Sequence, residues 1–329
     1  MFGAEDFLHQ DKSALTEATK SFIHIGGRPN RYPRFSSSKH NKTPTSSRPR
    51  SNTLQGSFYG ILSAQIFMLS NTYEGLSWTE DDNAKTMELE SEKDLARVEN
   101  WASRIKDVQA VKLGQVDRET MRKLLRLCSK KTPTILYLSG HTTKIAGEQV
   151  YLPADCFDAE KRIPVQGVSF KEMRKLLSPG NKAHSLLLIT DACNMSNFME
   201  LPFVLRVKGG RGYWEKTEHY VEGSSEMDQS IIHCASTEST GLSYGSRTKG
   251  GFYTQAFCNY RIDEELTLTK RSTEIQKDMS AYMKACAEMP DGQPLDQRHE
   301  IYSSKAFDLN DTNMLVNLGF PCVPNDSLP

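Results

Sequence analysis

Two stretches of sequence decide the fold, PTILYLSGHT at residues 133–142 and HSLLLITDAC at residues 184–193. Each is a short apolar run bounded by polar residues, which is typical of a buried strand. Each run leads directly into a reactive side chain, His141 in the first and Cys193 in the second. The segment VSFKEMRKLLSPG at 168–180 lies between them and has the pattern of a helix that ends at Pro-Gly. The sequence therefore predicts a strand–helix–strand unit.

The same alternation continues outward from this unit in both directions. We expect further strands at 57–67, 108–114 and 230–237, and helices at 79–106, at 116–128 and after Gly250-Gly251. Thr79 is the expected N-cap of the helix at 79–106. Alternating strands and helices predict an α/β fold with a mostly parallel sheet and helices on both faces. In such sheets the functional site lies beyond the carboxyl ends of the strands, where His141 and Cys193 are expected.

The chain divides into a folded part and two tails. Residues 1–55 are predicted to be a largely disordered N-terminal tail, because 28–50 is rich in Arg, Lys, Pro and Ser and has no acidic residue. The folded domain is expected at 56–309, with a mobile insert at 197–228 and a C-terminal tail at 310–329. The insert carries four basic residues around a Gly-Gly pair, namely Arg206, Lys208, Arg211 and Lys216.

Composition limits the classes of function. Of 329 residues, 41 are basic and 41 acidic, so the overall charge gives no indication of a nucleic-acid partner, and none is expected. Seven cysteines with no two-residue spacing between any pair argue against both a zinc site and a disulfide framework. Since neither a secretory signal nor a membrane-length apolar run is found, we expect a cytoplasmic or nuclear protein without a membrane partner.

A thiol and an imidazole at neighbouring strand ends suggest nucleophilic catalysis. A cysteine becomes a strong nucleophile when a nearby histidine takes its proton. His141 and Cys193 are 52 residues apart, at the ends of strands that one crossover helix would place side by side. Taken alone, each residue is more often a core cysteine or a surface histidine. The other close pair, His233 and Cys234, lies within one strand and would point to opposite faces.

Five segments resemble parts of the caspase and metacaspase domain, in that family's order. ILYLSGH at 135–141 resembles its catalytic-histidine strand, and LLITDAC at 187–193 resembles its nucleophile strand. The remaining matches are YLPADC at 151–156, SIIHCASTESTGLSYGSRTKGGFYTQAF at 230–257 and QPLDQRHEIYSS at 293–304. The resemblance covers about 55–308. It implies a caspase-like three-layer sandwich whose central, mostly parallel sheet has six strands.

The resemblance also implies a mechanism. Cys193 would be the nucleophile, His141 the general base and acid, and the backbone N–H groups of Thr142 and Cys193 would stabilise the oxyanion. Two positions depart from the family pattern, since Thr142 replaces a glycine and Asn194 replaces a histidine or arginine. These departures leave open an alternative, a catalytically weak caspase-like pseudopeptidase that acts as a protein-interaction module.

The resemblance implies a substrate as well. Metacaspases line the primary specificity pocket with an aspartate two residues before the cysteine, matched by Asp191, and with the serine matched by Ser139. A further aspartate comes from the start of the first helix, for which Asp82 is the best match and Asp81 the next. An anionic pocket selects Arg or Lys before the scissile bond. Arg247 keeps a second possibility open, acidic specificity as in caspases.

Cofactor, processing and assembly are less constrained by the sequence. No cofactor is required, but activation by Ca²⁺ is an expectation because many metacaspases need it. The two carboxylates that follow the histidine strand, Asp155 and Asp158, do not make a calcium site by themselves. The partners expected are protein or peptide substrates with a basic residue at the cleavage point, and the oligomeric state is open. Self-processing within 197–228 and a role in regulated cell death are further implications of the resemblance.

Overall fold

The computed structural model describes most of the chain between residues 64 and 311. The described residues are 64–78, 87–105, 108–128, 132–158, 160, 163–178, 184–222, 229–261, 266–286, 295–311 and 318. All of them belong to one compact unit. The predicted N-terminal tail, most of the predicted C-terminal tail, and Asp81 and Asp82 lie outside the described residues.

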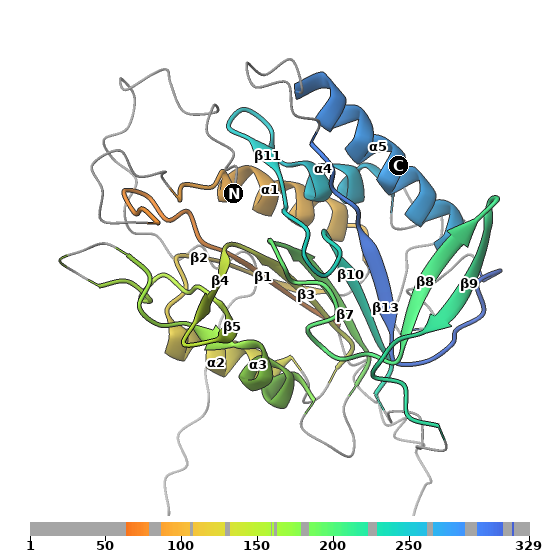
Figure 1. Cartoon of the computed structure of the whole chain (residues 1–329), viewed down its shortest axis with the longest axis horizontal. Helices are drawn as coiled ribbons and strands as arrows, with labels where there is room; N and C mark the ends of the chain where they lie inside the picture. The colour runs from red at the N-terminus through yellow and green to blue at the C-terminus, as the bar shows by residue number, and fades with distance from the viewer. Residues whose placement is uncertain are drawn as a thin grey trace, which may run out of the picture. The chain divides into compact units, whose positions relative to one another are not determined.

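A sheet of eight strands forms the centre of the described part of the chain, in the order β2-β1-β3-β7-β10-β13-β8-β9 (Figure 1). The strands are β1 (Gln65–Ser70), β2 (Gln109–Gly114), β3 (Thr134–Ser139), β7 (Leu186–Asp191), β8 (Phe203–Lys208), β9 (Arg211–Lys216), β10 (Ile231–Ala235) and β13 (Glu300–Ser303). The five strands from β2 to β10 are parallel to one another, and the pairs beyond β10 are antiparallel. The predicted α/β fold is confirmed, with two strands more than expected.

The two additional strands form a β hairpin inside the predicted insert. Phe203–Lys208 and Arg211–Lys216 pair in antiparallel register around Gly209 and Gly210. Both glycines have positive φ angles, 58° and 77°, as a two-residue hairpin turn requires. The predicted mobile insert at 197–228 therefore contains a pair of strands. The basic residues that indicated a loop stand on a strand pair at the edge of the sheet, and its outer strand has one face in solvent.

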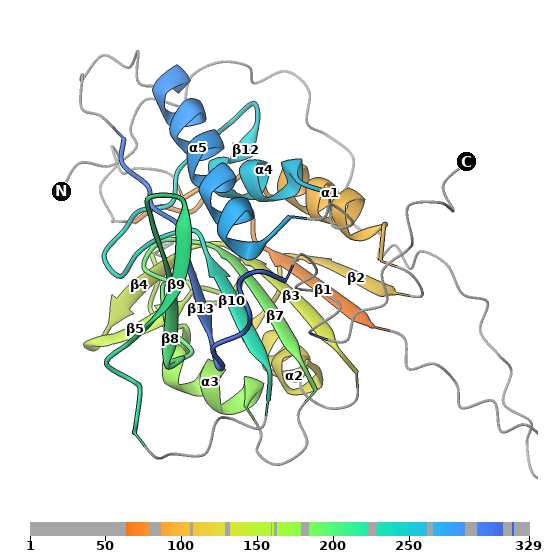
Figure 2. The same ribbon diagram turned by 90° about the vertical axis from the view of Figure 1, so that its right-hand side faces the viewer.

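Helices cover both faces of the sheet (Figures 1 and 2). One layer consists of α1 (Ser91–Ala102), α4 (Phe252–Asn259) and α5 (Leu268–Cys286), and the other of α2 (Arg118–Leu127) and α3 (Phe170–Leu177). Along β7, Leu187 and Ile189 pack into the α1/α4/α5 core, whereas Leu186 and Leu188 pack into the α2/α3 core. If this alternation continues to the carboxyl end of β7, the side chain of Asp191 points to the α1/α4/α5 face and that of Ala192 to the α2/α3 face. Within the described residues, none of the helices combines the length and the apolar character needed to cross a bilayer.

Two helix starts follow the expected capping chemistry and one differs from it. The carboxylate of Asp117 accepts a hydrogen bond from the Thr120 N–H at the start of α2, and the Ser169 hydroxyl accepts one from the Glu172 N–H at the start of α3. The first helix begins at Ser91 rather than after Thr79, so its predicted start was wrong. Residues 79–86 lie outside the described part of the chain.

Short strands lie beyond the carboxyl end of the main sheet. Three of them, β4 (Thr142–Ile145), β5 (Glu148–Tyr151) and β6 (Val168–Ser169), form a small antiparallel sheet directly after β3. Two more, β11 (Gly245–Ser246) and β12 (Gly250–Gly251), pair just before α4. Both sets surround the ends of β3 and β7, the region where the sequence predicted the functional site.

Candidate active site

The structure brings together the segments that carry His141 and Cys193. Strands β3 and β7 are neighbours, and their last residues, Ser139 and Asp191, stand opposite each other in register. Beyond the strand ends, the Thr142 hydroxyl donates a hydrogen bond of 2.5 Å to the Cys193 carbonyl oxygen. The backbone of Cys193 therefore lies next to the residue that follows His141.

His141 is held by the loop that follows β1 and by Met87. Its backbone N–H donates to the Tyr73 hydroxyl at 3.0 Å, and its ring packs against the rings of Tyr73 and Trp78, with centroids 4.8 Å and 5.0 Å away. Its Nε2 lies 2.7 Å from the Met87 carbonyl oxygen. Because a carbonyl only accepts, this contact places the proton on Nε2 and leaves Nδ1 with a lone pair. Burial lowers the pKa of His141 to about 4, so the ring is neutral at pH 7.

The thiol of Cys193 is half-buried beneath the loop that precedes β11. The Ser243 N–H donates to its Sγ at 3.2 Å. Burial raises the pKa of Cys193, and the Ser243 hydrogen bond opposes this shift. The next residue, Asn194, has a φ angle of 53° and donates its N–H to the Gly241 carbonyl at 3.1 Å. Asparagine tolerates this left-handed conformation better than most residues, so the chain accommodates its departure from the family pattern at position 194.

A buried glutamine, missed in the sequence, organises the loop over Cys193. The Gln297 Oε1 accepts from the Tyr244 N–H at 3.0 Å, and its Nε2 donates to the Ser236 carbonyl at 3.0 Å and the Ser243 hydroxyl at 3.3 Å. Gln297 is 1% exposed and lies just before β13, more than 100 residues from Cys193. A contact between residues so far apart in the sequence has no local pattern, so it could not be predicted from the sequence alone.

Asp191 and Asp94 bind the amino-terminal end of α4 from the α1/α4/α5 face of the sheet. One Asp191 oxygen accepts from the Thr254 N–H at 3.1 Å and from the Thr254 hydroxyl at 2.6 Å, and the other accepts from the Ser243 hydroxyl. Asp94 accepts from the Gly251 N–H at 3.0 and 3.1 Å. A Cβ atom on Gly251 would come within 2.2 Å of Asp191 and 3.4 Å of Asp94, so both carboxylates converge on this glycine.

Asp94 is the aspartate that the sequence reasoning missed. The expected third pocket residue was an aspartate at the start of the first helix, assigned to Asp82. That helix begins at Ser91, and its first-turn aspartate is Asp94, while Asp82 lies outside the described residues. The prediction for Asp82 therefore stays a prediction, and Asp94 is the aspartate that the structure places next to Asp191, on either side of Gly251. Ser139 lies opposite Asp191 and on the same face as Tyr137, which belongs to the α1/α4/α5 core.

The electrostatics of this carboxylate pair are unusual. Burial, and after it the neighbouring charge of Asp191, raise the pKa of Asp94 to about 7. Burial also raises the pKa of Asp191, against the effect of its hydrogen bonds. A guanidinium nitrogen of Arg97 lies 3.2 Å from Asp94 and partly offsets the two negative charges. A second cation at the pair would favour the charged form of both carboxylates and so lower their raised pKa values.

Arg247, the residue that kept acidic specificity open, forms an ion pair with a different carboxylate. It follows β11 in the turn before β12, and its guanidinium lies 3.8 Å from the Glu88 carboxylate. The Lys93 ammonium donates to its backbone carbonyl at 2.5 Å. Its side chain therefore already contacts a carboxylate other than Asp191 and Asp94.

The two carboxylates considered for calcium are engaged by the protein itself. Asp155 accepts from the Arg118 N–H at 2.7 Å, and Asp158 accepts from the Glu160 N–H at 2.9 Å. In the described part of the chain, no group of three or more His, Cys, Asp or Glu side chains is placed to hold a metal ion. Two carboxylates do not make a calcium site by themselves, and activation by Ca²⁺ stays a prediction.

A first prediction concerns Tyr73, whose hydroxyl also donates to the Leu152 carbonyl at 2.6 Å. Tyr73→Phe should lower the free energy of unfolding by about 1–3 kcal/mol, because the His141 N–H loses its acceptor and the Leu152 carbonyl keeps only the donor from Asn71 at 3.3 Å. Denaturant unfolding measures the change. The control is Tyr213→Phe on β9, where the side chain is 46% exposed and no comparable loss is expected. Equal unfolding midpoints for the two variants would contradict this account of how His141 is held.

Comparisons with known proteins add the family. The model of the caspase domain matches residues 86–305. The search of curated proteins finds no match. Among solved structures, the chain is similar to the crystal structure of protein GSU0716 from Geobacter sulfurreducens, with 12% identity over 75% of this chain and 95% of that chain and a TM-score of 0.45.

Proposed function

The chain belongs to the caspase domain family, and from this premise we propose that it is a cysteine endopeptidase that cleaves proteins after arginine or lysine. The observation that carries the proposal is the buried carboxylate pair of Asp94 and Asp191. Asp191 lies two residues before the Cys193 thiol, and the neighbouring strand leads to the neutral imidazole of His141, which the Met87 carbonyl orients. A substrate cation would balance the two carboxylates where Arg97 does so only in part.

The proposed mechanism uses the His141 tautomer fixed by Met87. Nδ1 accepts the proton of the Cys193 thiol, and the thiolate attacks the peptide carbonyl carbon. The backbone N–H groups of Cys193 and Thr142 bind the resulting oxyanion. His141 then returns the proton to the leaving amine, and water releases the acid product and the free thiol. Thr142 belongs to β4 and is not among the residues with positive φ, so threonine can replace glycine there without backbone strain.

One observation favours the second candidate function, a caspase-like module that binds partners without efficient catalysis. Ser243 contacts both functional groups, since its N–H donates to the Cys193 thiol and its hydroxyl donates to Asp191. A substrate must displace Ser243 from both before it reaches the nucleophile and the carboxylate pair. A chain in which this loop stays in place would be a poor enzyme.

Turnover of fluorogenic peptides tests the proposal. The substrates are identical except for Arg, Lys or Asp before the scissile bond, and each is assayed with and without Ca²⁺. Turnover of the Arg and Lys peptides alone is expected, and the assays with and without Ca²⁺ decide whether the ion activates the protein.

Absence of turnover from folded protein would favour the interaction module, and turnover of the Asp peptide would support acidic specificity. Fragments formed on storage, cut after the basic residues of 197–228, would indicate self-processing, a step consistent with a role in regulated cell death.

A pH dependence follows from the carboxylate pair. Because the pKa of Asp94 is about 7, this side chain gains its negative charge as the pH rises through that value. The preference for an arginine peptide over its neutral citrulline analogue should therefore increase by about tenfold between pH 6 and pH 8. Taking the ratio of kcat/KM for the two peptides cancels any titration of His141 and Cys193. Asp94→Asn should make the ratio low and independent of pH, and an unchanged titration in this variant would exclude Asp94 as its source.

A further inference from the structure

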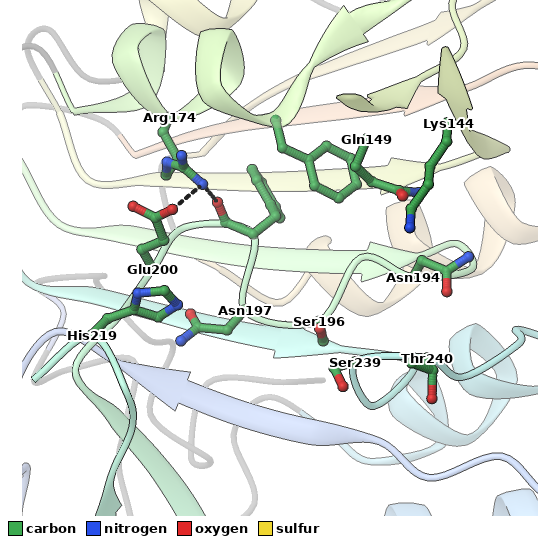
Figure 3. A pocket seen from close by; sticks show the side chains of 12 residues that line it. Lys144, Gln149, Arg174, Asn194, Ser196, Asn197, Glu200, His219, Ser239 and Thr240 are labelled. Carbon is green, nitrogen blue, oxygen red and sulfur yellow. Dashed lines mark hydrogen bonds and ion pairs between the residues drawn. The ribbon is translucent and has the colours of Figure 1, made fainter. Parts of the chain in front are cut away.

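A pocket of about 320 Å³ lies beside Cys193 and has no role in the function proposed so far. Its walls come from the β4–β5 hairpin, from α3, from the segment that follows Cys193, and from the loop that covers the thiol (Figure 3). Asn194, the residue directly after the cysteine, is part of the lining. Thr240, on the opposite wall, precedes the glycine whose carbonyl accepts the Asn194 N–H.

This pocket and the carboxylate pair lie on opposite faces of the sheet. Asp191 and Asp94 contact the amino-terminal end of α4 on the α1/α4/α5 face. The pocket is lined by Phe170 and Phe198, whose rings are 5.4 Å apart and belong to the α2/α3 core. Cys193 lies between the two faces, at the carboxyl edge of the sheet.

Hydrogen bonds connect the pocket wall to the backbone of the nucleophile. The Gln149 side-chain amide donates to the Thr142 hydroxyl at 3.4 Å, and this hydroxyl donates to the Cys193 carbonyl at 2.5 Å. Gln149 and Lys144 face each other across the β4–β5 hairpin, because their Cα atoms are partners in its register. The wall that carries Lys144 is thus fixed relative to Cys193.

The pocket carries one positive charge that its own lining does not offset. Arg174 is engaged by Glu200 at 2.9 Å and by the Phe198 carbonyl at 2.9 Å. Lys144 is exposed and makes no ion pair with any residue that the structure describes. Figure 3 shows its side chain next to Gln149, pointing toward the part of the pocket that Asn194 borders.

An extended peptide bound at Cys193 would place neighbouring side chains on the two opposite faces of the sheet. Successive side chains of a strand point to opposite faces. If the basic side chain before the scissile bond enters the Asp94–Asp191 face, the next side chain points toward the opposite face, where this pocket lies. The pocket is therefore placed to receive the residue that leaves with the amine product.

We propose that this pocket is the subsite for the residue after the scissile bond, and that Lys144 selects an aspartate or glutamate there. This inference rests on the proposed function, since a leaving-group subsite requires a peptidase. It predicts that the preferred cleavage points have a basic residue followed by an acidic one.

Quenched peptides with arginine before the bond and Glu, Gln or Lys after it test the inference. For the intact chain, kcat/KM with Glu should exceed that with the neutral isostere Gln by about 3- to 10-fold, and Lys should be poorest. Lys144→Glu should reverse the order of Glu and Lys. Lys171→Glu on α3 is the matched control, because Lys171 is exposed but does not line the pocket.

A second substrate separates this inference from the proposed function. A peptide that ends in arginine and a coumarin leaving group has no residue after the bond, so Lys144→Glu should leave its turnover within about twofold of the unmodified chain. Suppose that the intact chain cleaves this peptide. If it then cleaves the quenched peptides with Glu, Gln and Lys at equal rates, or if Lys171→Glu reverses the preference as well as Lys144→Glu does, the subsite proposal is wrong and the peptidase proposal remains. If the coumarin peptide is not cleaved by the intact chain, both proposals fall together.

Discussion

Replacing Cys193 with alanine should lower kcat/KM for arginine peptides by about 10,000-fold or more, because no other group can form the acyl-enzyme. The side chain is half-buried and small, so the thermal unfolding midpoint should change little. Initial rates with the fluorogenic arginine peptide measure the effect. Cys258→Ala is the matched control, since Cys258 is also a half-buried free thiol but lies on α4 among apolar neighbours.

The two variants separate a nucleophile from a structural thiol. Burial raises the pKa of Cys258 well above its usual range, so this thiol stays protonated near pH 7, and no histidine is known to contact it in the described part of the chain. Cys258→Ala should keep nearly full turnover. If Cys193→Ala retained more than about one per cent of the activity in folded protein, the assignment of the nucleophile would be refuted.

The second large effect is expected at Asp191. Asp191→Asn keeps the shape of the side chain and an oxygen that can accept from Thr254, but it removes one of the two buried charges. The preference for arginine over citrulline should fall by about 100-fold, since a charge-assisted pair in a desolvated pocket becomes a neutral contact. The ratio of kcat/KM for the two peptides measures the loss.

This ratio distinguishes charge recognition from a structural role. In a variant whose site is merely distorted, kcat/KM would fall equally for the arginine and citrulline peptides, so the ratio would stay constant. Asp278→Asn on α5 is the control, because this carboxylate accepts from Asn259 and Tyr260 and contacts neither Asp94 nor Asp191 in the hydrogen bonds of the described residues. If Asp191→Asn kept the full arginine preference, the Asp94–Asp191 pair would not be the specificity pocket.

The fold could be predicted from the sequence because its decisive strands are local patterns. The apolar runs of β3 and β7 are fully buried and carry a helix between them, so period, length and order specify a parallel pair. The hairpin of β8 and β9 could not be predicted in the same way. One face of its outer strand is exposed, so the basic residues that signalled a loop are compatible with a strand.

The residues of the candidate site likewise fall into two groups, those in local sequence patterns and those that reach the site through long-range contacts. Ser139 and Asp191 end β3 and β7, His141 and Cys193 follow two residues later, and the register of the two strands brings these segments together. Asp94, Tyr73 and Gln297 reach the site through contacts between distant parts of the chain, which a single sequence does not encode in any local pattern. Asp94 was missed for one further reason, the wrong start of the first helix. Its place beside Asp191 became apparent only from the arrangement of α1 and α4.

The most direct test of the central claim is the mass of the adduct formed with an arginine-based, cysteine-reactive peptide ketone. The intact protein is incubated with the arginine probe or with its citrulline analogue, digested, and the modified cysteine is identified by mass spectrometry. The account predicts one adduct per chain, on Cys193, formed faster with the arginine probe and absent in Cys193→Ala. Modification of another cysteine, or equal labelling of Cys193 by both probes, would contradict a Cys193 nucleophile beside a pocket for basic residues.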